Sequence, residues 1–203
     1  NRLYRNDGGT FTDVASQAGI ADSDVTRTSA WGDYNNDGHM DLFVGFVSRS
    51  GSHNKLYRND GDGRHFTDVT ESTGVSLTGS FRQACWVDYD NDGDTDIYVA
   101  NYGPNVLYQN NGDGTFTDVT QKAGVAGPQK LNGFTKWSLH GCFLDYDKDG
   151  WLDLYVGNYL AFDPKYRYYF APEGFPGPLS YEGQPDILYH NNGCLLYTSD
   201  AAD

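Results

Sequence analysis

The chain carries three nine-residue segments in which oxygen-bearing side chains recur at fixed positions. We name Asp33–Asp41, Asp88–Asp96 and Asp145–Asp153 the first, second and third aspartate loops. Carboxylates this close repel each other unless a cation lies between them. Side-chain oxygens at positions 1, 3 and 5, a backbone carbonyl at position 7 and a carboxylate at position 9 supply the oxygen ligands that Ca²⁺ takes, and glycine at position 6 allows the sharp turn. The predicted ligands of three calcium ions are Asp33, Asn35, Asp37, His39 and Asp41, then Asp88, Asp90, Asp92, Asp94 and Asp96, and finally Asp145, Asp147, Asp149, Trp151 and Asp153.

Two other local structures compete with this interpretation. Asp, Asn and Gly also form ordinary turns, but such turns do not need carboxylates at alternate positions. An EF-hand needs Glu at position 12 between two helices, whereas position 12 is Val44, Val99 or Val156. A β-branched and aromatic run such as Ile97-Tyr98-Val99 follows each loop and is typical of a strand. We therefore expect calcium loops inside β-hairpins.

The three loops differ in their number of carboxylates. Position 3 is Asn35 in the first loop but Asp90 and Asp147 in the others, which leaves the first loop with three candidate carboxylate ligands against four. Charge count tunes calcium affinity in such loops. The first loop is therefore predicted to bind most weakly.

The composition favours a β-rich chain. Its 203 residues include 28 acidic and 14 basic side chains, and 25 of the acidic ones are Asp. Asp favours turns and metal loops, whereas Glu favours helices. The net charge of -14 argues against binding to nucleic-acid phosphates. No apolar run reaches membrane-spanning length, and because the chain starts in mid-pattern without Met, we expect an internal fragment.

The loops belong to a longer repeat. They begin at intervals of 55 and 57 residues, and a Leu-Tyr-x-Asn motif recurs with them at residues 3, 56, 107 and 188. After the first three copies of that motif, a Gly-rich turn leads into Phe-Thr-Asp-Val, which predicts a hairpin. The middle repeat then holds four predicted strands, 84–87, 97–100, 106–109 and 116–119. Four short antiparallel strands at this period are typical of a β-propeller blade.

The motifs resemble those of a known family. The loop-plus-strand pattern and the Leu-Tyr-x-Asn hairpins resemble the FG-GAP/VCBS repeats of integrin-α-type propellers, and most of all those of the ASPIC/UnbV and cartilage-acidic-protein-like propellers. The resemblance covers residues 1–193. It implies an all-β fold: a β-propeller fragment of about three to four antiparallel blades from a larger, seven-bladed propeller. It says less about the role, because propellers host many functions.

Blade topology predicts two different ends of the molecule. In an up-and-down blade, the turns after strands one and three lie at one end and the connection after strand two lies at the other. The longest such connection, residues 159–186, is named the aromatic insert, and it holds five of the seven prolines. Aromatic side chains on a stiff loop offer contact area at low entropic cost, so we expect a partner-binding surface, although the insert could instead pack on its own propeller. Its aromatic residues are Tyr159, Phe162, Tyr166, Tyr168, Tyr169, Phe170, Phe175 and Tyr181.

The remaining reactive residues form no catalytic motif. The sequence has no HExxH, CxxC or phosphate-binding glycine loop, and of the five histidines only His140 is a candidate base. Cys85 and Cys142 each stand three residues before a loop, where the first copy has Ala30, so they are expected at small buried strand positions; a disulfide between them stays open. Residues 194–203 depart from the repeat and are interpreted as a non-native tail.

Together these features predict a non-catalytic module. We expect a calcium-binding propeller that binds a protein or glycan ligand outside the cell, at its surface or in the periplasm, where free calcium is high enough to fill weak sites. The alternative is a calcium-dependent carbohydrate-active enzyme of the polysaccharide-lyase type, or its accessory domain. Such an enzyme needs a basic groove for an anionic sugar, and the 14 Lys and Arg residues are scattered along the chain.

Overall fold

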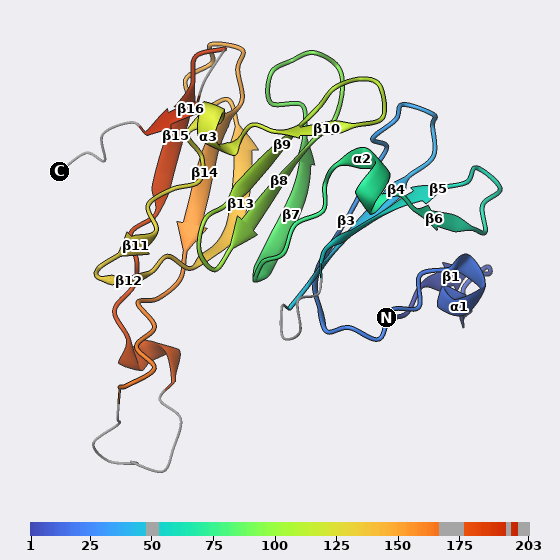
Figure 1. The fold of residues 1–203 in the computed structure, drawn as a ribbon, viewed down its shortest axis with the longest axis horizontal. Coiled ribbons are helices and arrows are strands. Elements are labelled where there is room, and N and C mark those ends of the chain that lie inside the picture. The colour runs from blue at the N-terminus through green and yellow to red at the C-terminus, as the bar shows by residue number, and fades with distance from the viewer. Residues whose placement is uncertain (48–52, 167–176, 194–195, 199–203) are drawn as a thin grey trace.

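The chain folds into a row of small antiparallel sheets that fan out side by side (Figure 1). The structure is a computed structural model, and it describes residues 1–47, 53–166, 177–193 and 196–198. Three sheets have four strands each, and a two-stranded sheet precedes them. Within every sheet the strands neighbour one another in chain order.

The elements follow the repeat. The opening hairpin is β1 (Tyr4–Asn6) and β2 (Phe11–Asp13), followed by α1 (Ala15–Ala18). The first full sheet is β3 (Thr26–Gly32), β4 (Asp41–Phe46), β5 (Lys55–Asn59) and β6 (Phe66–Asp68), followed by α2 (Thr70–Thr73). The second is β7 (Phe81–Val87), β8 (Asp96–Asn101), β9 (Val106–Asn110) and β10 (Phe116–Asp118), followed by α3 (Thr120–Ala123). A small hairpin, β11 (Lys130–Leu131) and β12 (Phe134–Thr135), leads to the third sheet: β13 (Ser138–Leu144), β14 (Asp153–Asn158), β15 (Ile187–Asn191) and β16 (Leu196–Thr198), with the 3₁₀ turn η1 (Pro178–Ser180) before β15.

These sheets confirm the predicted all-β fold of four-stranded antiparallel blades. In the second sheet, all four strands lie where the sequence predicts them, and β7 begins three residues earlier than expected, at Phe81. The sequence predicts a non-native tail from residue 194, yet the described residues of that segment, 196–198, pair with β15 as a fourth strand.

The middle strands of the first two full sheets each serve two hydrophobic cores. Successive side chains of a strand point to opposite faces of the sheet. In β8, Ile97 and Val99 pack with residues of the first full sheet, such as Phe43, while Tyr98 and Ala100 pack with residues of the third, such as Leu154. This is why β8 is buried along its whole length.

Glycine on the first strand of a sheet lets that strand approach the neighbouring sheet closely. A Cβ atom added at Gly141 of β13 would lie 2.4 Å from the ring of Tyr98, and one added at Gly32 of β3 would lie 2.5 Å from the ring of Trp86. A larger residue at either position would force the sheets apart. These contacts fix the spacing between blades.

The outer face of the third sheet explains the one wrong expectation about the cysteines. Cys85 of β7 is partly buried between sheets, but Cys142 of β13 is exposed, and both thiols are free. Tyr155 is 37% exposed, although its counterpart Tyr98 is 0% exposed. Among the described residues, no sheet packs on this side of β13 and β14, so Cys142 is not a buried strand position.

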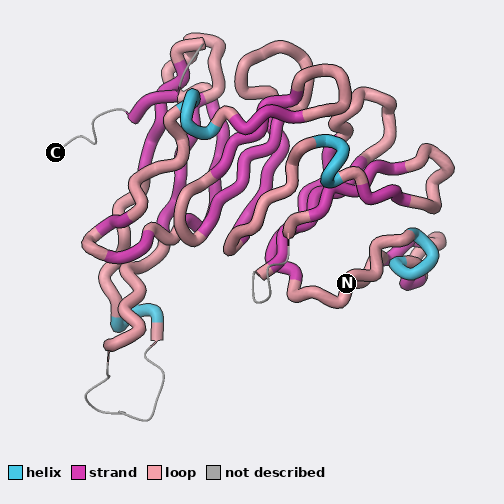
Figure 2. The backbone as a smooth tube through the Cα atoms, viewed as in Figure 1, coloured by secondary structure: helices cyan, strands magenta, loops and turns pink. Residues whose placement is uncertain are grey.

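A short helix follows the opening hairpin and the last strand of each of the first two full sheets (Figure 2). Each of α1, α2 and α3 has four residues and ends at a glycine in the left-handed conformation. Across the described residues, no helix has the length and apolar character needed to cross a membrane.

Candidate metal centres

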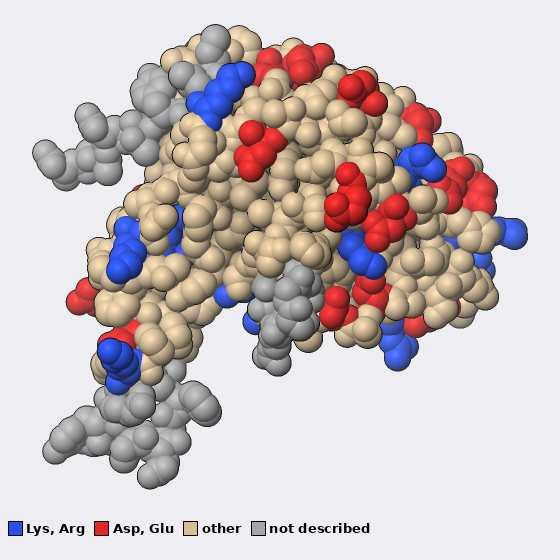
Figure 3. All heavy atoms as spheres, in the orientation of Figure 1, with Lys and Arg blue, Asp and Glu red and all other residues tan. Residues whose placement is uncertain are grey.

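The aspartate loops connect the first two strands of each full sheet and lie at one end of the sheets. The turns after the third strands lie at the same end, because Asn35, Asp37 and His39 line one polar pocket together with Asp60 and Gly61. The prediction that the aspartate loops and the turns after the third strands lie at the same end of the sheets is therefore confirmed. Acidic side chains gather along the upper edge of the molecule, where these loops lie (Figure 3).

The loop backbone curls around the carboxylate at position 1. In the second loop, Asp88 accepts hydrogen bonds from the backbone N–H groups of Asp92 (3.1 Å) and Gly93 (3.0 Å). Asp92 in turn accepts one from the N–H of Asp94 at 2.9 Å. The first and third loops repeat all three bonds with distances between 2.8 and 3.1 Å.

Two backbone positions in each loop are left-handed. The glycine at position 6 has φ of +85°, +90° and +92° in the three loops, as predicted. Position 4 is also left-handed and is occupied by Asn36, Asn91 or Lys148, with φ of 55°, 56° and 65°. Asn tolerates this region better than most residues, so the first two loops use a favourable residue and the third does not.

The carboxylate at position 9 fastens each loop to its sheet. Asp96 is 0% exposed and accepts hydrogen bonds from the N–H groups of Asn110 (2.8 Å) and Tyr89 (3.1 Å). It thereby joins the start of the loop to the end of β9. Asp41 and Asp153 are also 0% exposed and make the corresponding two bonds, at 2.7 and 3.1 Å and at 2.9 and 3.1 Å.

Burial makes the carboxylates of Asp96 and Asp41 unfavourable as bare anions. It raises the pKa of Asp96 to about 7 and that of Asp41 to about 6. Burial also raises the pKa of Asp90, and the neighbouring Asp92 adds to the effect. A cation among these groups would remove the cost of ionising them.

The arrangement fits a divalent cation that prefers oxygen ligands. In the second loop, Asp88, Asp90 and Asp96 each offer an oxygen within 4.8 Å of the others. Asp145, Asp147 and Asp153 form the same group in the third loop. One oxygen of Asp90 is buried without a hydrogen-bond partner, which a bound ion would supply. Asp33, Asn35 and Asp41 occupy the same loop positions in the first loop, with an amide in place of one carboxylate.

Asparagine side chains link neighbouring loops in a way that the sequence does not reveal. Asn36 of the first loop donates to Asp94 of the second (2.7 Å), and Asn91 of the second donates to the carbonyl of Gly150 in the third (3.0 Å). Asn110, at the end of β9, donates to the carbonyl of Tyr34 in the first loop at 2.7 Å. Asn191 makes the corresponding bond to Tyr89 at 2.8 Å. The three loops therefore form one connected structure.

The described part of the aromatic insert lies at the opposite end and is partly docked. Leu160 and Ala161 are each 5% exposed, and the buried side chain of Gln184 donates to the carbonyls of Leu131 and Thr135 and accepts from the N–H of Trp137. The base of the insert thus packs on its own fold. Tyr168, Tyr169, Phe170 and Phe175 lie outside the described residues.

The other insert aromatics meet residues that the sequence did not single out. Tyr159 and Phe162 lie edge-on to Trp137, with ring centroids 5.3 and 6.0 Å away. Tyr102 contacts the same indole at 5.3 Å, and the guanidinium of Arg82 lies 5.0 Å from it. The ladder continues from Phe162 through Tyr181 to Tyr166, at 5.7 and 5.4 Å. Phe162 and Tyr166, which are 37% and 38% exposed, present it to solvent.

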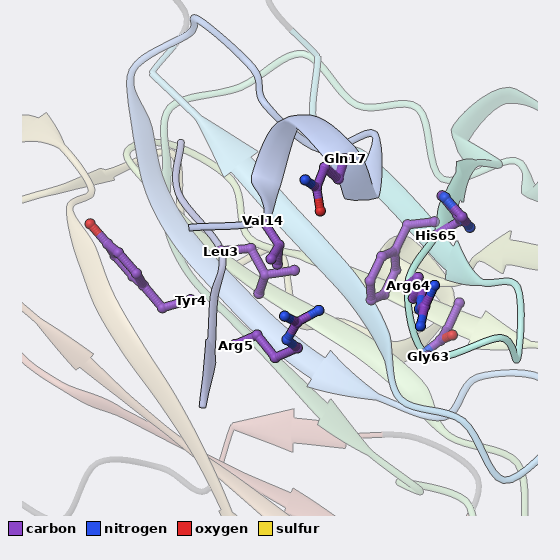
Figure 4. A pocket seen from close by; sticks show the side chains of 10 residues that line it. Leu3, Tyr4, Arg5, Val14, Gln17, Gly63, Arg64 and His65 are labelled. Carbon is purple, nitrogen blue, oxygen red and sulfur yellow. The ribbon is translucent and has the colours of Figure 1, made fainter. Parts of the chain in front are cut away.

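A pocket of about 410 Å³ lies between the opening hairpin and the first full sheet (Figure 4). Leu3, Val14 and Gln17 line one side, and Arg64 and His65 line the other. In the next gap along the row, Tyr34 fills the corresponding space by packing on Phe116 at 5.8 Å.

The candidate base His140 is exposed on β13, and its ring lies against the backbone of Gly157. His65 is bonded to Asp62 and His53 to Thr78. Neither of these two hydrogen bonds gives His140 an acidic or basic partner.

Comparison with protein families gives a clear result. A family model described as FG-GAP-like repeat matches residues 1–44, 46–99 and 88–156. A search of curated proteins finds no match to the chain.

Proposed function

The chain belongs to the FG-GAP-like repeat family, and from that premise we propose that it is a calcium-stabilised propeller segment that binds a partner outside the cell. The observation that carries the proposal is the second aspartate loop, where a fully buried carboxylate lies beside two others within 4.8 Å. Calcium in each loop would neutralise these carboxylates and hold the hairpin. Within the family, the motifs favour the ASPIC/UnbV type.

The role proposed for calcium is structural. Each loop already has its backbone hydrogen bonds, so the ion adds stability rather than building the turn. A site filled at a hundred times its dissociation constant adds about 2.7 kcal/mol. Extracellular modules bind calcium in the range of roughly 10⁻⁴ to 10⁻³ M. The proposed place is therefore outside the cell, at its surface or in the periplasm, where free calcium would fill sites of that affinity.

A calorimetric calcium titration of the chelator-treated chain tests this role. We expect three calcium ions per chain and a melting temperature that rises with calcium concentration. A folded chain that binds no calcium would show that the aspartate loops are ordinary turns, and the proposal would fail.

The proposed partner surface is the exposed end of the aromatic ladder, around Phe162 and Tyr166. Rings held by their neighbours lose little entropy on binding, and Arg82 adds a charge beside Trp137. The ligand class is a protein or glycan of the cell surface or matrix.

Binding to arrays of glycans and matrix proteins tests the surface. The double variant Phe162→Ala, Tyr166→Ala should no longer bind the array ligands that retain the natural chain. Tyr4 is an exposed tyrosine of the opening hairpin, and Tyr4→Ala should leave that binding unchanged. Equal retention of all three proteins would place the partner elsewhere.

A further inference from the structure

The third aspartate loop differs from the other two in the side chain that the neighbouring strand places beside it. The residue after the Leu-Tyr pair is Arg58 in β5, Gln109 in β9 and His190 in β15. Gln109 donates to Asp90 at 2.6 Å, and Arg58 pairs with Asp60 at 3.3 Å. Only the third loop therefore has an imidazole at this position.

The imidazole lies among the carboxylates of the loop. Nδ1 of His190 is 3.0 Å from an oxygen of Asp153 and 3.5 Å from an oxygen of Asp147. The side chain of His190 is 17% exposed, and its ring packs edge-on against Tyr146, with centroids 5.9 Å apart. Packing on one side and carboxylates on the other fix the orientation of the ring.

Two overlapping sets of ligand atoms result. Asp147, Asp149 and His190 have ligand atoms within 4.8 Å of one another, and so do Asp145, Asp147 and Asp153. Asp147 belongs to both sets. An ion held by the set that contains His190 therefore competes with a calcium ion held by the set of three carboxylates. Among the described residues, the corresponding set in the second loop contains oxygen ligands alone.

Ligand chemistry separates the two sets. Calcium takes oxygen ligands, whereas an imidazole beside two carboxylates suits first-row divalent metals such as Mn²⁺, Co²⁺ and Zn²⁺. We infer that the third loop binds a transition metal in preference to calcium, with Asp147, Asp149 and His190 as ligands, while the first two loops bind calcium alone. This inference extends the proposed cation binding. It depends on that proposal in one respect only, that the third loop is an ion site.

Cobalt is the probe, because its visible absorption reports the ligands directly. The whole chain, freed of metal and then saturated with calcium, is titrated with Co²⁺. We expect one Co²⁺ per chain, a visible band that Zn²⁺ abolishes, and release of one calcium ion. His190→Gln, which copies Gln109 of the second sheet, should weaken Co²⁺ binding at least about tenfold and leave three calcium ions bound.

His65→Gln is the matched control, since His65 is an exposed histidine bonded to Asp62 in a hairpin turn. It should bind Co²⁺ like the natural chain. Melting temperatures of all three proteins in chelator report whether the substitutions disturb the fold. Should His190→Gln unfold, broadening of the His190 imidazole NMR signals by Mn²⁺ in the natural chain gives the same answer.

The outcomes separate this inference from the proposed function. Equal Co²⁺ binding by the natural chain and His190→Gln, or no effect of Mn²⁺ on the His190 signals, overturns the transition-metal site. Loss of Co²⁺ binding in His190→Gln supports it, even in a chain whose first two loops bind no calcium. In that case the proposed calcium role fails while the third-loop site stands.

Discussion

The two ends of the sheets are built in different ways. At the loop end, the same hydrogen bonds recur three times around Asp33, Asp88 and Asp145, and asparagine amides join one loop to the next. At the insert end, each connection has its own length, and the contacts around Trp137 occur once. Repetition marks the part that holds the blades together, whereas the unique part includes the surface that we propose for partner binding. Substitutions at the two ends should therefore have opposite consequences for stability and for binding.

The largest effect is expected at the buried carboxylate of the second loop. Asp96→Asn replaces one of the two oxygens that accept from Asn110 and Tyr89 with an N–H donor, and it removes a proposed ligand. A buried N–H without an acceptor costs roughly 1–3 kcal/mol, before any loss of calcium. Urea unfolding in calcium should show this loss, and calorimetry should count one calcium ion fewer. Asp113→Asn, in an exposed turn at the same end, is the control; equal stability of the two variants would contradict the role of Asp96.

The pH dependence of the calcium effect should arise at the loop end. Without calcium, the pKa of Asp96 is about 7 in the folded chain, against roughly 3.9 in an unfolded chain. Between these values the folded state holds a proton that the unfolded state lacks, so this group lowers stability as pH rises from about 4 to about 7. Calcium binds the ionised carboxylate, so the calcium-induced rise in melting temperature should grow across the same window.

Melting curves at pH 5, 6, 7 and 8, each with and without calcium, check this expectation. Comparing the melting temperatures with and without calcium at the same pH removes the contribution of titratable groups far from the loops. A calcium effect that stays constant from pH 5 to pH 8 would contradict it.

A smaller effect is expected from the difference between the first and second loops. Asn35→Asp gives the first loop the carboxylate that Asp90 supplies to the second. Its calcium affinity should increase, by about tenfold if the added charge contributes about 1.4 kcal/mol. Calorimetry resolves the weakest of the three sites. Unchanged affinity would show that charge count does not set the order of the loops.

The smallest effect on calcium is expected from shortening the insert. Excision of 159–186 would remove Leu160, Ala161 and Gln184, which are buried, so a sharper variant replaces only 163–181 with a short Gly-Ser linker. Calcium stoichiometry and affinity should stay within experimental error, while partner binding is lost. Loss of calcium binding would show that the two ends are not independent.

The sequence predicts the loop end well because each element there occurs several times. Recurrence separates the candidate ligand positions from chance aspartates, and the alternation in strands such as β8 identifies the blades. The bonds between loops, such as Asn36 to Asp94, depend on how neighbouring sheets align, which no local pattern encodes. The same holds for Tyr102, Trp137 and Arg82, which come from separate segments and meet only in the fold. The short helices escape prediction because four residues make about one turn and carry no helical periodicity.

Diffraction from crystals grown in calcium, recorded at a wavelength where calcium scatters anomalously, tests the central claim most directly. We expect a peak inside the first and second loops, about 2.3–2.6 Å from the oxygens at positions 1, 3, 5 and 9 and the carbonyl at position 7. In the third loop we expect a calcium peak that is lost when Zn²⁺ is added, and a zinc peak beside His190 in its place. Loops without anomalous density at saturating calcium, with the hydrogen bonds described above intact, would contradict calcium binding by the aspartate loops.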